Sequence, residues 1–340
     1  MDRSWLVPVG LVGTFLVCAA CVCLVVIGLF GLGLWTNIRI NDGLNVNFGA
    51  TPTAAPQVIR PTPEGSSSVE GRESEVVVSS ETLETLQNTI VPISDLRDLA
   101  LRLEGKDNIP LTIVSPAGNL NIGSRKDFWV ANVDTNENFQ INTTLQYLTD
   151  RTYFWIQEGI TYDEQDLQNL AETFDSEIYP ITREFFGSEW TPGVDGDPHL
   201  YIVYAEGLGS NLAGYFSSAD ENHPLAHEYS NAHEMFLLNA DNVGLNEEFA
   251  YSVLAHEFQH MIHWYRDRNE SSWINEGFSE LAVLLNGYEV GSDFDFIYDP
   301  DLQLNDWPNE EDATLPHYGA AFLFLTYFMD RFGDEATRDL

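Results

Sequence analysis

Residues 253–262 read Val-Leu-Ala-His-Glu-Phe-Gln-His-Met-Ile and contain the pattern H-E-x-x-H. Residues four apart in a helix lie on the same face, so His256 and His260 can reach one metal ion. The flanking residues are apolar nearly all round, which predicts a buried helix over 247–266. Burying two imidazoles and a carboxylate without partners costs on the order of several kcal/mol. A bound zinc ion would supply the missing partner.

A zinc site needs a third protein ligand, for which the sequence offers two routes. The extended pattern H-E-x-x-H-x-x-G-x-x-H is absent, because His263 replaces its glycine and Arg266 its last histidine. The other route is a glutamate on a following helix, predicted over 272–287. We expect Glu276 to be this ligand. Glu280 lies on the same helix face and either orients a ligating histidine or is itself the ligand.

The remaining polar residues of the first helix receive different assignments. Glu257 follows the first histidine and cannot share its ligand position, so we expect it to accept a proton from the attacking water. His263 is three residues beyond His260. We expect it to be a structural or pocket-wall histidine, because the three expected ligands and one open position already complete a four-coordinate zinc site. The alternative is that His263 is an additional ligand.

Together, His256-Glu257-x-x-His260 and the later Trp273-Ile274-Asn275-Glu276-Gly277-Phe278 resemble the gluzincin class of zinc peptidases. The class includes thermolysin-like endopeptidases and aminopeptidases with a W-L-N-E-G-F-A segment. The resemblance implies that Glu276 is the third ligand and that Glu280 orients the first histidine. The gap from His260 to Glu276 is shorter than usual for the class and would favour Glu280. Residues 150–330 look most similar to hyicolysin-like or immune-inhibitor-A-like bacterial secreted peptidases.

The resemblance also implies a tyrosine or histidine that stabilises the oxyanion of the reaction. Tyr318 is the first choice and His317 the second, and aromatic packing on the core is the alternative. Zincins bind extended substrates along an edge strand, for which the segment 214–220 is a candidate, an ordinary strand and loop being the alternative. Asp195-Gly196-Asp197 could bind Ca²⁺ through its carboxylates, although the pattern favours a plain turn.

The N-terminal part predicts a membrane anchor. Residues 5–35 carry no charge and exceed the about 20 residues that span a bilayer, so we expect a transmembrane signal anchor after a stub at 1–4. A cleaved signal peptide and a secreted protein are the alternative. The Pro/Thr/Ser-rich stretch 36–75 is a predicted linker. Residues 76–340 are the predicted metallopeptidase domain, expected to be incomplete at its C-terminus and to lie outside the cytoplasm of a single-pass membrane protein.

The distribution of patterns along the chain predicts an α+β fold. Strands are expected at 111–114, 128–133, 139–147, 151–157, 199–205 and 234–239. Helices are expected at 83–103 with a break near Pro92, and at 163–186, 247–266, 272–287 and 318–332. The expected architecture is zincin-like, with an N-terminal mixed sheet, the active-site helix, and a C-terminal helical subdomain, all preceded by a single transmembrane helix.

The amino-acid composition limits which classes of partner the protein can bind. The chain has 53 acidic and 15 basic residues and a net charge of -38, which excludes a nucleic-acid partner. The three cysteines, Cys18, Cys21 and Cys23, all lie in the N-terminal apolar run, so no disulfide holds the remainder. No feature of the sequence indicates an oligomeric state.

These features predict a membrane-anchored zinc endopeptidase that hydrolyses protein or peptide substrates with one catalytic zinc ion. A zinc aminopeptidase is one alternative, but the G-x-M-E-N segment that would anchor a free amine is absent. A non-catalytic zincin-fold binding or adhesion module is another, and the intact Glu257 argues against it.

Overall fold

The computed structural model describes residues 80–89, 92–113, 120–308 and 311–340. The predicted anchor at 5–35 and linker at 36–75 lie outside these residues. Among the helices of the described ranges, none is long and apolar enough to cross a membrane. The described residues belong to one compact unit, Ser79–Leu340.

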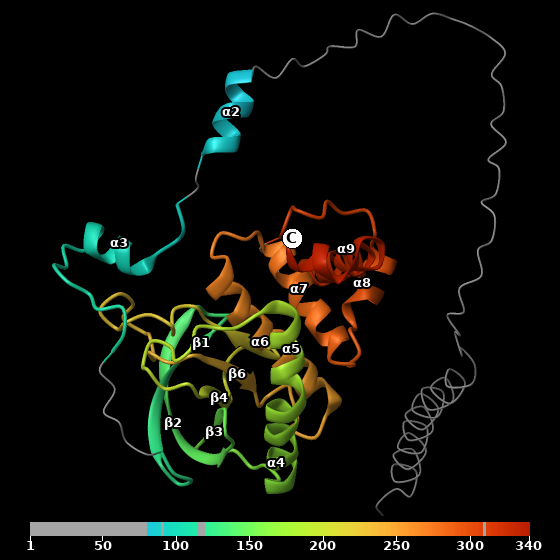
Figure 1. Ribbon diagram of the computed structural model, residues 1–340. Helices are drawn as coiled ribbons and strands as arrows, with labels where there is room; N and C mark the ends of the chain where they lie inside the picture. The colour runs from blue at the N-terminus through green and yellow to red at the C-terminus, as the bar shows by residue number, and fades with distance from the viewer. Residues whose placement is uncertain (1–79, 90–91, 114–119, 309–310) are drawn as a thin grey trace, which may run out of the picture. The chain divides into compact units, whose positions relative to one another are not determined.

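Within the described residues, the strands form a single mixed sheet in the order β1-β2-β3-β4-β6-β5 (Figure 1). The strands are β1 (Arg125–Asn132), β2 (Glu137–Leu148), β3 (Thr152–Gln157), β4 (Leu200–Ala205), β5 (Gly214–Phe216) and β6 (Met235–Asn239). The pairs β3–β4 and β4–β6 are parallel, and β1–β2, β2–β3 and β5–β6 are antiparallel. The short strand β5 is therefore an edge.

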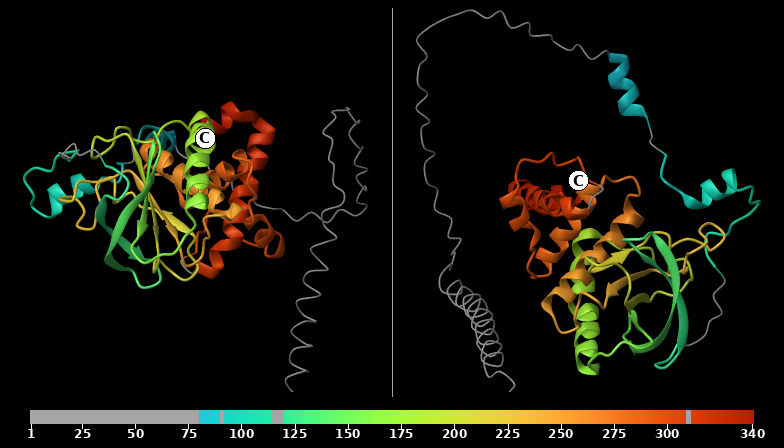
Figure 2. Two further views of the ribbon diagram at one scale, coloured as in Figure 1. Left: turned by 90° about the horizontal axis from the view of Figure 1, so that it is seen from below. Right: turned by 180° about the vertical axis from the view of Figure 1, so that it is seen from behind.

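Two helices of the main body, α4 and α5, come between β3 and β4, and the other four follow the last strand; the helices gather beside the sheet (Figure 2). The helices of the main body are α4 (Glu164–Thr173), α5 (Tyr179–Phe186), α6 (Glu248–Arg266), α7 (Ser272–Leu285), α8 (Ser292–Tyr298) and α9 (Glu311–Arg338). One π-helical turn, Phe174–Ile178, joins α4 to α5. Gly333 has a φ of 85° and interrupts α9. A small apolar cluster that contains Phe278 and Leu325 joins α7 to α9.

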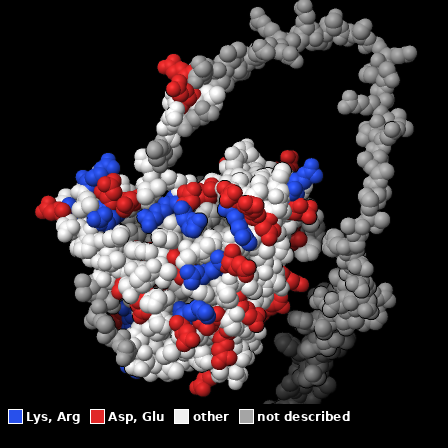
Figure 3. Space-filling view, in the orientation of Figure 1, with Lys and Arg blue, Asp and Glu red and all other residues white. Residues whose placement is uncertain are grey.

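Charged side chains of both signs cover the surface. On the face seen in Figure 3, Lys and Arg side chains lie next to Asp and Glu side chains. Exposed ion pairs among the described residues include Arg102 with Asp98, at 2.9 Å. Because such exposed pairs contribute only about 0–1 kcal/mol each, the fold depends mainly on its apolar interior.

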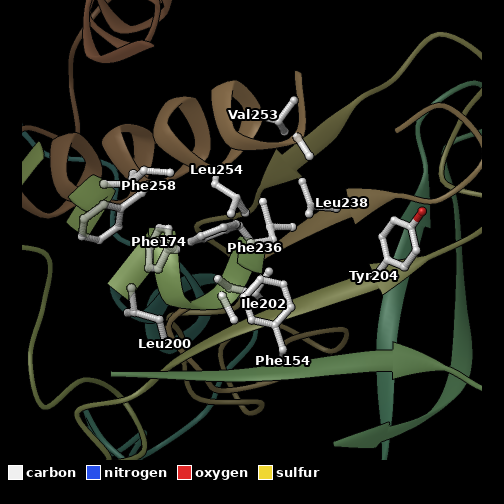
Figure 4. Close-up of a cluster of buried hydrophobic side chains, with 14 of the residues drawn as sticks. Phe154, Phe174, Leu200, Ile202, Tyr204, Phe236, Leu238, Val253, Leu254 and Phe258 are labelled. Carbon is white, nitrogen blue, oxygen red and sulfur yellow. The ribbon is translucent and has the colours of Figure 1, made fainter. Parts of the chain in front are cut away.

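The core lies between the sheet and the helices α4, α5 and α6. Alternate residues of β3 point to opposite faces, so Phe154 contributes to the helix-covered face and Trp155 to the other. Figure 4 shows α6 lying across the strands, with Leu254 and Phe258 directed toward Phe174 and Phe236. Each of these four side chains is fully buried. The sheet therefore fixes the position of α6, the helix that carries H-E-x-x-H.

The structure confirms the prediction of a mixed α+β fold. The break expected near Pro92 separates α2 (Ser80–Asn88) from α3 (Leu96–Leu103). A strand was expected at 111–114, but residues 111–113 form none. Their backbone is held by a hydrogen bond of 2.7 Å from Ile113 N–H to Val194 O. Val114 lies outside the described residues. Helix α8 was not predicted, because its seven residues are too few to display a helical period.

Candidate metal centre

Helices α6 and α7 bring three potential metal ligands together. His256 Nε2 lies 3.0 Å from His260 Nε2. Glu276 Oε2 lies 3.3 Å from His256 Nε2 and 3.2 Å from His260 Nε2. Within the described ranges, these residues form the one group of three or more His, Cys, Asp or Glu side chains that could hold a metal ion.

The donor set fits a zinc ion. Tetrahedral coordination with bonds of about 2.0–2.1 Å separates neighbouring ligand atoms by roughly 3.3 Å. The separations of 3.0, 3.2 and 3.3 Å among the three ligand atoms match this value. Glu276 Oε2 is also buried without a well-directed hydrogen bond inside the described chain. Two imidazoles and one carboxylate leave a fourth position open, as in catalytic zinc sites.

The outer nitrogens of the two histidines have different partners on α7. His256 Nδ1 lies 3.2 Å from Glu280 Oε1. His260 Nδ1 lies 3.2 Å from Asn275 Oδ1 and 2.9 Å from Ser279 Oγ. Partners of this kind fix the tautomer, so that Nε2 presents its lone pair to a metal.

The two glutamates of α7 are thereby distinguished, since Glu276 faces both Nε2 atoms and Glu280 faces an Nδ1 atom. The sequence analysis assigned no function to Asn275 or Ser279. The feature that could have identified them is their four-residue spacing, which places both on the face of α7 that meets α6.

The proton acceptor expected at Glu257 is held by the edge strand. Its Oε2 accepts a hydrogen bond of 2.7 Å from the backbone N–H of Phe216 in β5. Burial raises the pKa of this carboxyl, and the nearby His256 and His260 oppose the shift. The strand can lie close to α6 because residue 214 is glycine: a Cβ there would lie 2.8 Å from Val253 Cγ1 of α6. The segment expected as a substrate edge therefore contains an edge strand beside the metal centre.

Tyr318 and His317 occupy different surroundings at the start of α9. The ring of Tyr318 lies 6.3 Å from that of His256. Burial, followed by the carboxylates of Glu276, Glu257 and Glu280, raises the pKa of Tyr318 well above its usual value. The ring of His317 packs at 5.7 Å from that of Trp307.

The two expected oxyanion groups thus differ in position. Both rings pack against that of Trp307, Tyr318 at 5.1 Å and His317 at 5.7 Å, and Tyr318 also has the carboxylates of Glu276, Glu257 and Glu280 as charged neighbours.

The carboxylates of the proposed Ca²⁺ turn contact histidines. Asp195 Oδ2 lies 2.6 Å from His233 Nδ1, and Asp197 Oδ1 contacts His199 Nδ1. Within the described residues they belong to no convergent group of metal ligands. Ca²⁺ binding at this turn stays a prediction. The side chain of His263 lies outside the group of potential metal ligands, with its ring 5.6 Å from that of Phe278.

Comparison with known proteins gives one relative. No protein-family model matches the chain. The neutral metalloprotease ShpI of Staphylococcus hyicus is 31% identical over an alignment that covers 47% of this chain and 40% of that protein. The chain therefore spans well under half of the length of the relative that it matches. Over part of its length the chain is therefore similar to a metalloprotease.

Proposed function

We propose that this chain is a zinc endopeptidase of the gluzincin type, with His256, His260 and Glu276 as metal ligands. The observation that carries the proposal is the convergence of these three side chains next to a buried carboxylate, Glu257. The name of the relative, a neutral metalloprotease, supports the same chemistry.

The mechanism that we infer divides the chemistry between zinc and Glu257. When bound, zinc polarises the scissile carbonyl and lowers the pKa of water. Glu257 accepts a proton from the attacking water and delivers it to the leaving amine. The Phe216 N–H holds the Glu257 carboxylate in place by donating to Oε2. The second Oε atom is then left for the proton that is transferred.

Residues around this pair supply orientation. Glu280, Asn275 and Ser279 fix the two imidazoles. The Tyr318 hydroxyl donates a hydrogen bond to the oxyanion as it develops, with His317 as the second choice. Edge strand β5 offers backbone groups to an extended substrate.

The Glu257→Gln variant tests the mechanism. We expect it to keep zinc and the fold but to lose hydrolysis of a casein-like substrate by about 10²–10⁴-fold, because an amide cannot accept the proton. Zinc content and cleavage rate are measured on the same preparations. Glu248→Gln, an exposed change on the same helix, is the matched control and keeps its activity. Wild-type turnover in Glu257→Gln would exclude the mechanism.

Endopeptidase activity distinguishes this proposal from its alternatives. An endopeptidase cleaves peptides with blocked and free N-termini alike, whereas an aminopeptidase requires the free amine. A zinc-loaded protein that cleaves no peptide would instead favour a binding module.

We also propose that residues 5–35 anchor the domain at 76–340 on the outer side of the membrane. Protease accessibility of the domain on intact cells, combined with membrane fractionation, tests this placement.

A further inference from the structure

A pocket opens beside the metal centre. It has a volume of about 310 Å³, and both His260 and Glu276 line it. The rest of its wall comes from β5, from the end of α6, from α7, and from the segments that follow β5 and α6: Phe216, Ser218, Trp264, Asp267, Arg268, Glu270 and Asn275. A substrate residue close to the scissile bond would enter this pocket, which has room for one side chain.

Arg268 is the one Lys or Arg among the residues that line the pocket. Its Cζ lies 5.4 Å from the centre of the Trp264 ring. Its guanidinium makes no hydrogen bond or ion pair with the described parts of the chain. Stacking on an indole holds a guanidinium without using its N–H groups, so its donors stay available for a planar acceptor.

The acidic neighbours of Arg268 do not neutralise it by direct pairing. Asp267 Oδ1 accepts a bond of 2.8 Å from Asn269 N–H. Glu270 Oε1 accepts a bond of 2.6 Å from Ser271 N–H. Glu221 is within electrostatic range of Arg268, but burial raises the pKa of Glu221 well above its usual value, which favours the neutral form.

We propose that this pocket is a subsite for a carboxylate carried by the substrate, which Arg268 binds through two parallel hydrogen bonds. The inference rests on the proposed peptidase function and specifies its substrate class. A guanidinium fork matches a carboxylate in geometry and charge, and an amide of the same shape satisfies it less well. Because the chain has a net charge of -38, an acidic substrate is retained only where a positively charged side chain such as Arg268 attracts it.

The test uses matched peptides that carry Glu, Gln or Lys at successive positions around one cleavable bond. We expect the zinc-loaded wild type to prefer Glu over Gln at one position by about tenfold or more in kcat/KM. Arg268→Gln should lose that preference while keeping its zinc content. Arg268→Lys should retain part of it. Arg266→Gln changes the last residue of α6, which does not line this pocket, and is the control that retains the preference fully.

Two sources of the carboxylate are separated by a second peptide series. Peptides with a free or an amidated C-terminus at the preferred position show whether an acidic side chain or a terminal carboxylate is bound. Equal cleavage of Glu and Gln peptides at every position, or a preference that survives in Arg268→Gln, overturns the proposal.

Binding without turnover separates this inference from the peptidase proposal. The Glu257→Gln protein should bind the Glu peptide more tightly than the Gln peptide, and the added Arg268→Gln change should abolish the difference. If the zinc-loaded wild type cleaved no peptide and the Glu257→Gln protein still bound the Glu peptide more tightly, the peptidase function would be refuted and the subsite would stand. Cleavage without any preference would refute the subsite alone.

Discussion

Glu276 and Glu280 of α7 lie one turn apart, yet they face different atoms of His256. Glu276 Oε2 lies 3.3 Å from its Nε2, and Glu280 Oε1 lies 3.2 Å from its Nδ1. Spacing along the chain could not separate the two, because the assignment depends on how α7 crosses α6. The H-E-x-x-H pair was predictable, since both histidines belong to one helix and local geometry alone brings them together.

The different positions of Glu276 and Glu280 should be visible in the zinc affinities of their alanine variants. Glu276→Ala removes a metal ligand, so we expect zinc to be lost on purification. Glu280→Ala removes only the partner of an outer nitrogen, and we expect a zinc affinity about 10–100-fold weaker. Competition with a coloured chelator measures both, and Glu289→Ala, an exposed change beyond the end of α7, is the control. Equal losses in the two variants would contradict the assignment.

At the scale of elements, edge strand β5 and helix α6 share one carboxylate. The Phe216 N–H can reach Glu257 only if β5 approaches α6 closely. Residue 214 permits this approach, because a side chain there would lie 2.8 Å from Val253 Cγ1. The short strand thus links the position of the proposed substrate edge to that of the proposed base.

Gly214→Ala should therefore reduce catalysis without removing the metal. The added methyl group forces β5 away at a cost of about 1–3 kcal/mol, so Glu257 loses its backbone donor. We expect a fall in kcat, a lower melting temperature and unchanged zinc content. Gly291→Ala is the control, since a Cβ there meets no atom within 4 Å. A Gly214→Ala enzyme with wild-type kcat would show that the strand does not position the base.

Prediction from sequence succeeded for elements with a clear period and a buried face. The apolar stripe of residues 163–186 predicted a helix, although a π-helical turn lies inside it. Pocket residues such as Trp264 and Arg268 carry no periodic signal of their own. Trp264 lies one helical turn after His260 on α6, so local geometry brings these two together. Arg268 lies beyond the end of α6, and its place in the pocket beside Glu276 depends on how the segment between α6 and α7 folds, which is a tertiary effect.

At the scale of the whole molecule, several acidic side chains lie in the interior. Glu234 is 2% exposed, and burial raises its pKa to about 8. Only one of its oxygens has a hydrogen-bond partner, the Val194 N–H at 2.8 Å. Neutralisation of this carboxyl therefore accompanies folding at neutral pH.

The contribution of Glu234 to folding stability should consequently decrease as the pH rises from about 5 to about 8. Glu234 holds a proton in the folded state that the unfolded chain releases above its ordinary pKa of 4.5, so folding stability falls between about pH 5 and 8. The slope from this group is at most about 1.4 kcal/mol per pH unit. Urea unfolding of wild type and Glu234→Gln at saturating zinc should show a shallower decline in the variant. Parallel pH profiles would indicate that Glu234 is ionised when buried.

The ligands of α6 and α7 have a mechanical consequence. A metal ion held by His260 and Glu276 is a removable cross-link that closes the segment 261–275 into a ring. Such a closure lowers the conformational entropy available to the chain, much as a disulfide does, but it can be opened by chelation. Trp264 and Arg268 both lie inside this ring, so the walls of the pocket and the metal centre are tightened by the same event. Removal of the ion would then loosen the pocket wall together with the proposed metal centre.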